Sequence, residues 1–328
     1  MSKATRAALA LLAGALITIS LLAAPGAATA APLQLTGDLG AHDPALVAGT
    51  AGRPWYVFAT GGGAGGGTIT VRSSPDGRNW TYRGTIWNSK PAWITQAIPG
   101  VSNLWAPEIV LVDGVYRMYY SASTFGSQRS LIGLATNTTL DPADPAYRWV
   151  DQGKVFESFG GNPYNAIDPG VIDADGTRWM SFGSWWTGIY AIRLGSNGKP
   201  ASGAQPVHLA DRRPVGTSAI EAPYIVRRGA YYYLFTSFDV CCAGADSTYK
   251  IAVGRSTSVT GPYADRAGRQ LLQGGGTVIL ARRGADVAAG GQSVSAGWIG
   301  YHTYGGYGFR LGIEWLSWTS DGWPYVSS

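Results

Sequence analysis

Apolar and aromatic residues recur along the chain in short runs separated by glycine-containing turns, and this pattern returns five times. Each unit opens on a short apolar run, turns into an aromatic run, and continues into a second run rich in β-forming residues. In the second unit these runs are 105–110, 115–121 and 130–135. The polar residues that mark the five openings are Asp43, Glu108, Asp168, Glu221 and Gln292. Successive openings lie roughly 50 to 70 residues apart, and regular recurrence of this kind is typical of repeat architectures.

The repeat predicts an all-β fold. Strands with turn signals between them, and no helical periodicity, indicate four-stranded blades around an axis. Five units predict a five-bladed β-propeller. A jelly roll or a sandwich would also be rich in strands, but neither explains why the opening motif returns. In a propeller the first strand of each blade lines the axis, so carboxylates far apart in sequence meet at one end of it.

The first 30 residues have a different pattern from the rest. Lys3 and Arg6 precede an uncharged apolar run at 7–24, and Ala28-Thr29-Ala30 gives the small-x-small pattern of a signal-peptidase site. This order predicts a signal peptide over 1–30 and a single propeller domain over 31–328. The run is borderline in length for a membrane span, so length alone does not exclude an anchor, but its alanine content and the cleavage pattern favour removal. We therefore expect a secreted, extracellular protein without membrane contact after cleavage.

Composition supports a β-protein and excludes few partners. The chain contains 47 Gly, 13 Trp and 18 Tyr, and only 14% of its residues are charged. Exposed aromatic rings suit the apolar faces of sugars; the alternative is that most of the aromatic residues fill the core. The net charge of +5 falls to +3 without Lys3 and Arg6. No Lys/Arg run is present, so we expect no nucleic-acid partner.

The two cysteines, Cys241 and Cys242, are adjacent. Consecutive Cα atoms lie about 3.8 Å apart, which is closer than a relaxed disulfide prefers. The pair forms either a strained vicinal disulfide or two buried thiols. The sequence has no zinc-binding pattern.

The carboxylates at the openings indicate acid–base chemistry. Like charges around one cavity raise each other's pKa, which keeps a carboxyl protonated so that it can act as an acid. Glycoside hydrolysis requires such an acid together with a second carboxylate. A single Asp-Pro turn can be structural, but its recurrence favours a shared site. The histidines are His42, His208 and His302, and no Gly-x-Ser-x-Gly turn indicates a serine nucleophile.

Several motifs in order along the chain resemble the family 43 glycoside hydrolases, and within them the endo-1,5-α-L-arabinanases. They are His42-Asp43-Pro44, Leu104-Trp105-Ala106-Pro107-Glu108, Asn165-Ala166-Ile167-Asp168-Pro169, Glu221-Ala222-Pro223-Tyr224, Tyr231-Tyr232-Tyr233-Leu234-Phe235, Ser237-Phe238-Asp239-Val240-Cys241-Cys242, Ser247-Thr248-Tyr249-Lys250 and Gly261-Pro262-Tyr263. The Ser-Phe-Asp-x-Cys-Cys stretch is specific to the arabinanase branch.

The resemblance implies a role for each carboxylate. Asp43 matches the general base, Glu221 the general acid, and Asp168 the third carboxylate, which raises the pKa of the acid and orients it. The family inverts anomeric configuration, so the base and acid carboxyls would lie about 6.5–9.5 Å apart. Glu108 matches no catalytic residue, and we interpret it as a structural or electrostatic neighbour.

The resemblance also implies sugar-binding residues. Trp105 and Phe125 match residues that stack on arabinose rings. Gly126, Asn165, Ser184 and Trp185 match positions that contact the sugar at the cleavage point. For each of these six residues, packing around the cavity is the alternative.

The resemblance further implies a central metal, usually calcium, at His302. Calcium normally prefers oxygen ligands, and a lone histidine is more often a core residue. Two departures lie nearby: Ala289-Gly290-Gly291-Gln292 lacks the proline usual in the family, and Gly305 replaces the usual aspartate. They affect the metal environment and leave the three carboxylates untouched. We expect no organic cofactor.

These observations together predict an endo-acting hydrolase of α-1,5-linked arabinan. We expect its substrate to be arabinan or arabino-oligosaccharides, and the protein to be a monomer. An exo-acting arabinanase or an α-L-arabinofuranosidase would share the same carboxylates. A sugar-binding propeller without catalysis would lack one of them, and a purely structural propeller would have no need for any.

Overall fold

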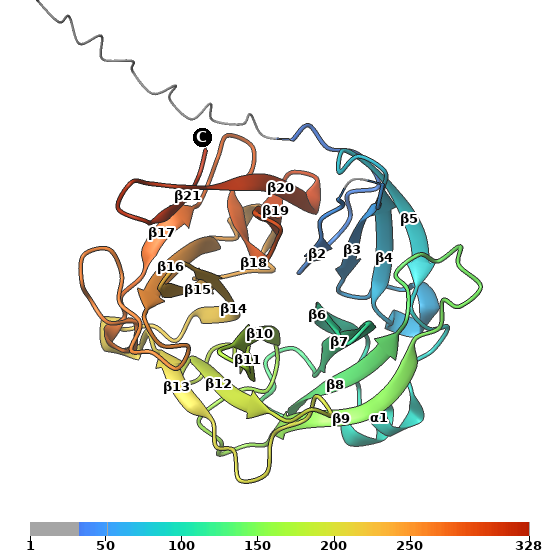
Figure 1. Ribbon diagram of the computed structural model, residues 1–328, viewed down its shortest axis with the longest axis horizontal. Coiled ribbons are helices and arrows are strands. Elements are labelled where there is room, and N and C mark those ends of the chain that lie inside the picture. The colour runs from blue at the N-terminus through green and yellow to red at the C-terminus, as the bar shows by residue number, and fades with distance from the viewer. Residues whose placement is uncertain (1–32, 51, 328) are drawn as a thin grey trace, which may run out of the picture.

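Five β-sheets form blades around a central axis in the computed structural model, which describes residues 33–50 and 52–327 (Figure 1). The five-bladed β-propeller predicted from the repeat is therefore confirmed. The predicted signal peptide over 1–30 lies outside the described residues. Among the helices that are described, none is long and apolar enough to cross a bilayer.

Each blade is an antiparallel meander of four consecutive strands, with the first strand innermost. Blade 1 contains β2 (Ala45–Val47), β3 (Trp55–Ala59), β4 (Thr70–Ser74) and β5 (Asn79–Thr85), with β1 (Thr36–Gly37) added parallel to β5. Blade 2 contains β6 (Leu104–Val112), β7 (Val115–Ala122), β8 (Ser130–Asn137) and β9 (Val150–Ser158). Blade 3 contains β10 (Gly170–Ala174), β11 (Thr177–Phe182), β12 (Ile189–Leu194) and β13 (Val207–Ala210). Blade 4 contains β14 (Ile220–Arg228), β15 (Tyr231–Phe238), β16 (Lys250–Ser256) and β17 (Thr277–Leu280). Blade 5 contains β18 (Ala288–Ser295), β19 (Trp298–Gly305), β20 (Gly308–Trp318) and β21 (Pro324–Val326).

Helical structure is confined to the connections between strands. The described residues include one short α-helix, α1 (Ala92–Ala97), between the first two blades. Four 3-10 turns are η1 (Ala64–Gly67), η2 (Arg213–Val215), η3 (Gly244–Asp246) and η4 (Leu271–Gln273).

Aromatic side chains of the second strands fill the space between blades. Tyr120 of β7 is fully buried with Phe58 and Leu104 of neighbouring strands. Gly133 lies directly opposite Tyr120 across the β7–β8 pair, where an added Cβ would be 2.4 Å from the tyrosine ring. Fully burying a large apolar side chain contributes about 1.5–3 kcal/mol, so these aromatic strands stabilise the ring of blades.

The five openings share a backbone turn, and this turn corrects the register read from the sequence. One residue in each opening has left-handed φ: Asp43, Ala106, Asp168, Ala222 and Gly291. In blades 2, 4 and 5 this residue and the next bulge out of the β-ladder. Glu221 therefore lies one position before the repeated turn, and Glu108 lies two positions after it. The predicted equivalence of all the marker residues was wrong, because the repeat preserves backbone shape and leaves the position of the carboxylate free.

The ring closes between blade 5 and blade 1. Ser293 Oγ accepts the amide hydrogen of Leu46 at 2.9 Å and donates to the carbonyl of Pro44 at 2.6 Å. The amide of Leu311 donates to the carbonyl of Leu39 at 2.7 Å. We call this junction the seam, since it joins segments from opposite ends of the described chain.

Candidate active site

A cleft of about 1180 Å³ receives residues from all five blades. It contains the three predicted catalytic carboxylates and all six predicted sugar-binding residues. These are Asp43, Trp105, Phe125, Gly126, Asn165, Asp168, Ser184, Trp185 and Glu221. The fold thus brings together residues that are separated by more than half of the sequence.

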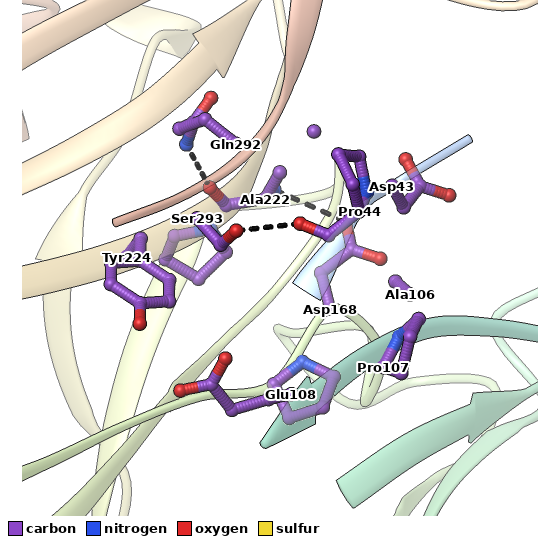
Figure 2. Close-up of a pocket in the computed structure, with 13 residues that line it drawn as sticks. Asp43, Pro44, Ala106, Pro107, Glu108, Asp168, Ala222, Tyr224, Gln292 and Ser293 are labelled. Atoms are coloured by element: carbon purple, nitrogen blue, oxygen red, sulfur yellow. Dashed lines mark hydrogen bonds between the residues drawn. The ribbon is translucent and has the colours of Figure 1, made fainter. Parts of the chain in front are cut away.

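A second, much smaller cavity of about 30 Å³ lies on the axis and is lined by the repeated turns (Figure 2). Asp43 and Asp168 border both cavities, whereas Glu108 borders only the axial one. Glu108 is 2% exposed, and burial raises its pKa to about 8. The amide of Val171 is its backbone donor, at 3.4 Å. Glu108 is thus a neutral buried neighbour of the carboxylate set at neutral pH.

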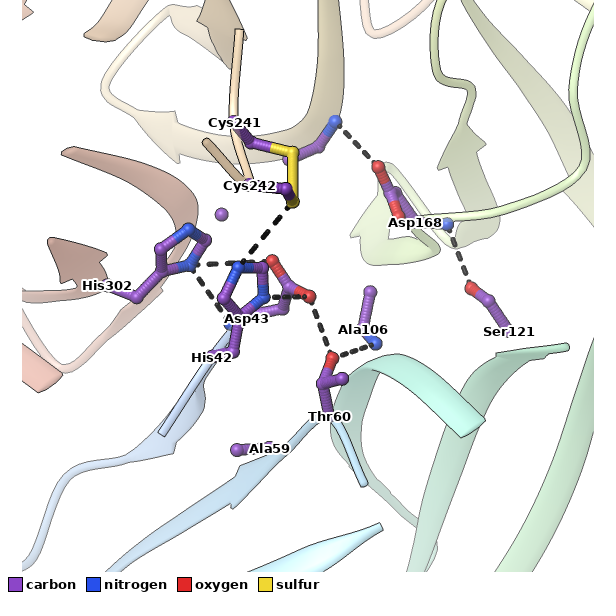
Figure 3. Close-up of polar contacts among 12 residues, drawn as sticks. His42, Asp43, Ala59, Thr60, Ala106, Ser121, Asp168, Cys241, Cys242 and His302 are labelled. Atoms are coloured by element: carbon purple, nitrogen blue, oxygen red, sulfur yellow. Dashed lines mark hydrogen bonds and ion pairs between the residues drawn. A yellow bond between two sulfur atoms is a disulfide. The ribbon is translucent and has the colours of Figure 1, made fainter. Parts of the chain in front are cut away.

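Two side-chain donors hold Oδ2 of Asp43, while its Oδ1 lies 3.5 Å from His302 Nδ1 (Figure 3). Its Oδ2 accepts hydrogen bonds from His42 Nδ1 at 2.8 Å and from Thr60 Oγ1 at 2.7 Å. Burial alone would raise the pKa of Asp43, but attraction to His42, its hydrogen bond, and lesser contributions from His302 and Thr60 lower it well below its usual value. Asp43 is therefore an anion with Oδ1 left for another partner.

Asp168 and Glu221 form a buried pair. The amide of Ala222, next to Glu221, donates to Asp168 Oδ2 at 3.1 Å. Burial raises the pKa of Asp168 far above its usual value, and repulsion from Glu221 and Asp43 raises it further. Burial also raises the pKa of Glu221, against hydrogen bonds from Ser184 Oγ at 2.6 Å and Tyr249 Oη at 2.7 Å. The two carboxyls therefore retain a proton between them at pH values where an isolated carboxyl would have lost it.

The predicted sugar-binding residues differ in their contacts. Phe125 is 85% exposed at the cleft, which no packing role explains, and Trp185 is also exposed. Asn165 is buried, and within residues 33–50 and 52–327 its Oδ1 has no hydrogen-bond partner. Ser184 is committed to Glu221. An unpaired buried amide oxygen is costly, so Asn165 presents an acceptor to whatever enters the cleft.

His302 lies beneath the cleft, fully buried and stacked on His42 with ring centroids 3.7 Å apart. His302 Nδ1 accepts the amide hydrogen of Asp43 at 3.1 Å. Burial lowers the pKa of His302 well below its usual value, so the ring is neutral and carries its proton on Nε2. That Nε2 has no partner among the described residues.

The side chains around His302 can be compared with the ligands that the predicted calcium would need. His42, Asp43 and His302 bring one candidate ligand atom each to within 4.8 Å of one another. Two of the three are imidazoles, whereas calcium prefers a shell of oxygens. A ring nitrogen must release its proton before it can act as a ligand, and Asp43 Oδ2 already accepts two hydrogen bonds. These contacts do not fit calcium, so we derive no step through a metal, and the calcium site stays an untested prediction.

Sequence reasoning missed several residues that hold the carboxylates. Thr60 donates to Asp43, and Ser121 accepts the amide hydrogen of Asp168. Both lie at the ends of second strands, and nothing in their local sequence sets them apart. Tyr249 and His42 stood within quoted motifs, and His42 adjoins Asp43, so proximity alone could have signalled its role. Tyr304 contacts His42 only through the seam.

Comparison with known proteins agrees with this geometry. A model described as Glycosyl hydrolases family 43 matches residues 39–324. The extracellular exo-α-(1→5)-L-arabinofuranosidase ArbA of Cellvibrio japonicus is 40% identical, with 87% of this chain and 86% of the relative covered. The extracellular endo-α-(1→5)-L-arabinanase 1 of Bacillus subtilis is 39% identical, with 86% of each covered.

Solved structures give the same result. The GH43 endo-arabinanase from Bacillus licheniformis has a TM-score of 0.83 and 40% identity, covering 89% of this chain and 99% of that one. A Cellvibrio cellulosa α-L-arabinanase complexed with arabinohexaose has a TM-score of 0.80 and 39% identity, covering 88% and 95%. A family model that spans most of the chain, and relatives of this identity over most of their own length, show that the chain belongs to the glycosyl hydrolases of family 43.

Proposed function

We propose that the chain is a secreted, inverting glycoside hydrolase that cleaves internal α-1,5-L-arabinofuranosidic bonds of arabinan. The observation that carries this proposal is the contrast in charge within one cleft. Asp43 is held ionised, while Asp168 and Glu221 share a retained proton. A base and an acid facing one cavity are the requirement for hydrolysis of a glycosidic bond.

Each carboxylate has a chemical role in this proposal. Asp43 Oδ1, free of the side-chain donors that occupy Oδ2, takes a proton from the attacking water. Glu221 protonates the leaving sugar oxygen. Asp168 lies against the amide that follows Glu221, and burial together with repulsion between the carboxyls keeps a proton in this pair, available to Glu221. Activity then requires Asp43 without its proton and Glu221 with one.

The cleft suits a sugar chain. Phe125 and Trp185 offer exposed rings to apolar sugar faces, and Asn165 offers an unpaired acceptor to a hydroxyl. The volume of about 1180 Å³ exceeds the usual range for sites that enclose one small ligand, which favours several sugar units. A related arabinanase is named for its complex with arabinohexaose. These observations support arabinan or an arabino-oligosaccharide as the substrate.

Internal cleavage is the finer part of the proposal, because the relatives include both endo- and exo-acting enzymes. An exo-acting arabinanase or α-L-arabinofuranosidase is the second candidate. Linear arabinan should yield a mixture of oligosaccharides at early times, as separated by anion-exchange chromatography. Arabinose as the sole early product would replace the endo assignment with the exo one.

The same reaction tests catalysis and stereochemistry. Proton NMR of the first product should show the β-anomer before mutarotation, as inversion requires. Glu221→Ala should abolish turnover and leave the thermal unfolding profile cooperative. An active Glu221→Ala variant would remove Glu221 as the acid, and a parent protein that binds arabinan without hydrolysing it would favour a non-catalytic sugar-binding propeller.

Secretion rests on two observations of different kinds. The pattern over 1–30 is that of a signal peptide, and two relatives are named extracellular. Expression of the full chain should release a protein that begins at residue 31, as read by N-terminal sequencing. Retention of the full chain in the membrane fraction would contradict export with cleavage.

A further inference from the structure

A chain of hydrogen bonds connects the adjacent cysteines to the ionised carboxylate of Asp43. The amide of Cys242 donates to Tyr304 Oη at 3.1 Å. Tyr304 Oη lies 2.5 Å from His42 Nε2, and His42 Nδ1 lies 2.8 Å from Asp43 Oδ2. Figure 3 shows Cys242, His42 and Asp43 in this order along one wall of the site.

One placement of the protons satisfies these contacts and also aligns all of the donors. Asp43 is an anion and can only accept, so the Nδ1 of His42 must carry a proton. Tyr304 Oη accepts from the Cys242 amide and turns its own hydrogen toward His42 Nε2, which is then the accepting nitrogen. Every donor therefore points toward Asp43. Hydrogen bonds aligned in this way polarise and strengthen one another.

The outer end of the chain is fixed by a disulfide. Cys241 and Cys242 are bonded to each other, and both border the cleft. Cys242 has φ of +66°, a left-handed conformation that is unfavourable for a residue other than glycine. The small ring closed by the disulfide limits the rotation of this peptide. Without that ring, Cys242 is free to leave the left-handed region and withdraw its amide from Tyr304.

We propose that the Cys241–Cys242 disulfide, Tyr304 and His42 form a positioning relay that orients Asp43 for catalysis. The proposal rests on the proposed function, in which Asp43 is the base. The relay acts on the carboxylate rather than on the sugar, so its loss should lower kcat and leave KM nearly unchanged. The disulfide thereby makes turnover sensitive to reduction.

Removal of one hydroxyl tests the middle of the relay. Tyr304→Phe keeps the ring and deletes the link between Cys242 and His42. The loss of one well-placed hydrogen bond should lower kcat about tenfold, with KM within about twofold. Tyr301→Phe is the matched control, because Tyr301 lies on the same strand and its hydroxyl donates to Glu314, away from the cleft. Equal kcat in the two variants would overturn the relay.

Reduction tests its outer end. Dithiothreitol supplies two electrons and two protons to the disulfide, giving two thiols, and closes to its own cyclic disulfide. The chain has two cysteines in all, so the reagent has one target. In the parent, kcat should fall as two thiols per chain become titratable. The double variant Cys241→Ser/Cys242→Ser should have the same low kcat as the reduced parent, and dithiothreitol should not change it.

Reduction of the Tyr304→Phe variant distinguishes the relay from a general loosening of the loop that carries Cys241 and Cys242. Since the link to His42 passes through Tyr304, reduction should not lower the kcat of Tyr304→Phe any further. A second, equal loss on reduction of Tyr304→Phe, or a fully reduced parent with unchanged kcat, would overturn the proposal. A parent without activity on arabinan would instead contradict the proposed function and would be seen before any variant is made.

Discussion

At the scale of single residues, burial alone does not decide the charge of a carboxyl. Asp43 and Glu108 border the same axial cavity, where Glu108 is buried and Asp43 is half-buried. Asp43 has two side-chain donors and a histidine stacked beneath them, so its pKa is lowered. For Glu108, burial outweighs the hydrogen-bonding influence of the amides of Val171 and Ile109 and of the Tyr224 hydroxyl, and raises its pKa to about 8. Neighbouring donors therefore separate an anion from a neutral acid.

Glu108→Gln should change how stability depends on pH. The folded pKa of Glu108 is about 8, above the usual value of 4.5. The folded state therefore holds a proton that the unfolded state releases, and the stability from Glu108 is lost as pH rises from about 4.5 to 8. Between pH 5 and 8 this loss is on the order of 4 kcal/mol. Gln mimics the neutral acid, so denaturant unfolding should find the variant more stable than the parent at pH 8 and similar at pH 4.5.

Glu157 gives a control of the opposite sign. Its pKa is lowered, despite some burial, by Lys154 and Arg129, so its carboxylate stabilises the fold once ionised. Glu157→Gln should lose stability at neutral pH and approach the parent as pH falls. A Glu108→Gln variant that is less stable than the parent at pH 8 would contradict a neutral Glu108.

The residues of the site were predictable to different degrees. Asp43 and Asp168 were visible because each precedes a proline at the start of an apolar run. Their chemical roles came from resemblance to a family, since spacing alone would also have admitted Glu108. Thr60 was not predictable, because its contact with Asp43 depends on the register between β2 and β3 within blade 1. Tyr304 was not predictable, because its contact with His42 depends on how blade 5 packs against blade 1.

At the scale of elements, one recurring bulge supplies different side chains to the cleft. The position before the left-handed turn is Trp105 in blade 2 and Glu221 in blade 4, where each pairs with the second strand of its blade. The left-handed position itself supplies Asp43 and Asp168. Two adjacent positions of one backbone motif thus provide both the aromatic side chain of Trp105 and the three carboxylates of the cleft.

The strands were predictable where they are buried. The aromatic runs, such as 115–121 and 231–237, became β7 and β15 with nearly the same bounds. The outermost strands escaped detection, because β5 and β17 are largely exposed and carry no clear alternation. Such edges have little apolar pattern to read, although the number of strands per blade implied them.

The loop between β7 and β8 should control substrate affinity. Phe125 stands on this loop, 85% exposed, so its removal has little to destabilise. Phe125→Ala should raise KM for arabinan by up to about tenfold through lost ring stacking, worth about 0.5–1.5 kcal/mol, with kcat retained. Initial-rate kinetics would measure this change.

Phe159, which follows β9, provides the matched control for the Phe125→Ala variant. It is 50% exposed but does not border the cleft. Phe159→Ala should leave both KM and kcat at parental values. An unchanged KM in Phe125→Ala would show that this ring does not bind the sugar.

At the scale of the whole molecule, the seam is the point on which the closed ring depends. At the other junctions, the two neighbouring blades are connected by the chain itself. Blade 5, in contrast, meets blade 1 only through packing and hydrogen bonds. Ser293 satisfies two backbone groups of blade 1 there, those of Leu46 and Pro44, and is buried. The architecture was predictable from the repeat, but this closure was not, because its bonds join unrelated sequence segments.

Ser293→Ala should therefore destabilise the propeller. It leaves an amide of Leu46 and a carbonyl of Pro44 without partners, at about 1–3 kcal/mol for each buried group. Ser295→Ala is the matched control, because Ser295 satisfies only the amide of Ala48 in a half-buried setting. Denaturant titration should give a clearly larger loss for Ser293→Ala, and equal losses would mean that the seam is not specially dependent on it.

The seam also has a consequence for biosynthesis. Asp43 leaves the ribosome among the first folded residues, whereas His302 and Tyr304, which contact Asp43 and His42, are among the last. A nascent chain already contains all three carboxylates before blade 5 is made, yet Asp43 then lacks its contact with His302, and His42 lacks its contact with Tyr304. Catalytic competence is thus withheld until translation of the final blade, and enzyme activity reports completion of the polypeptide rather than the presence of its catalytic residues.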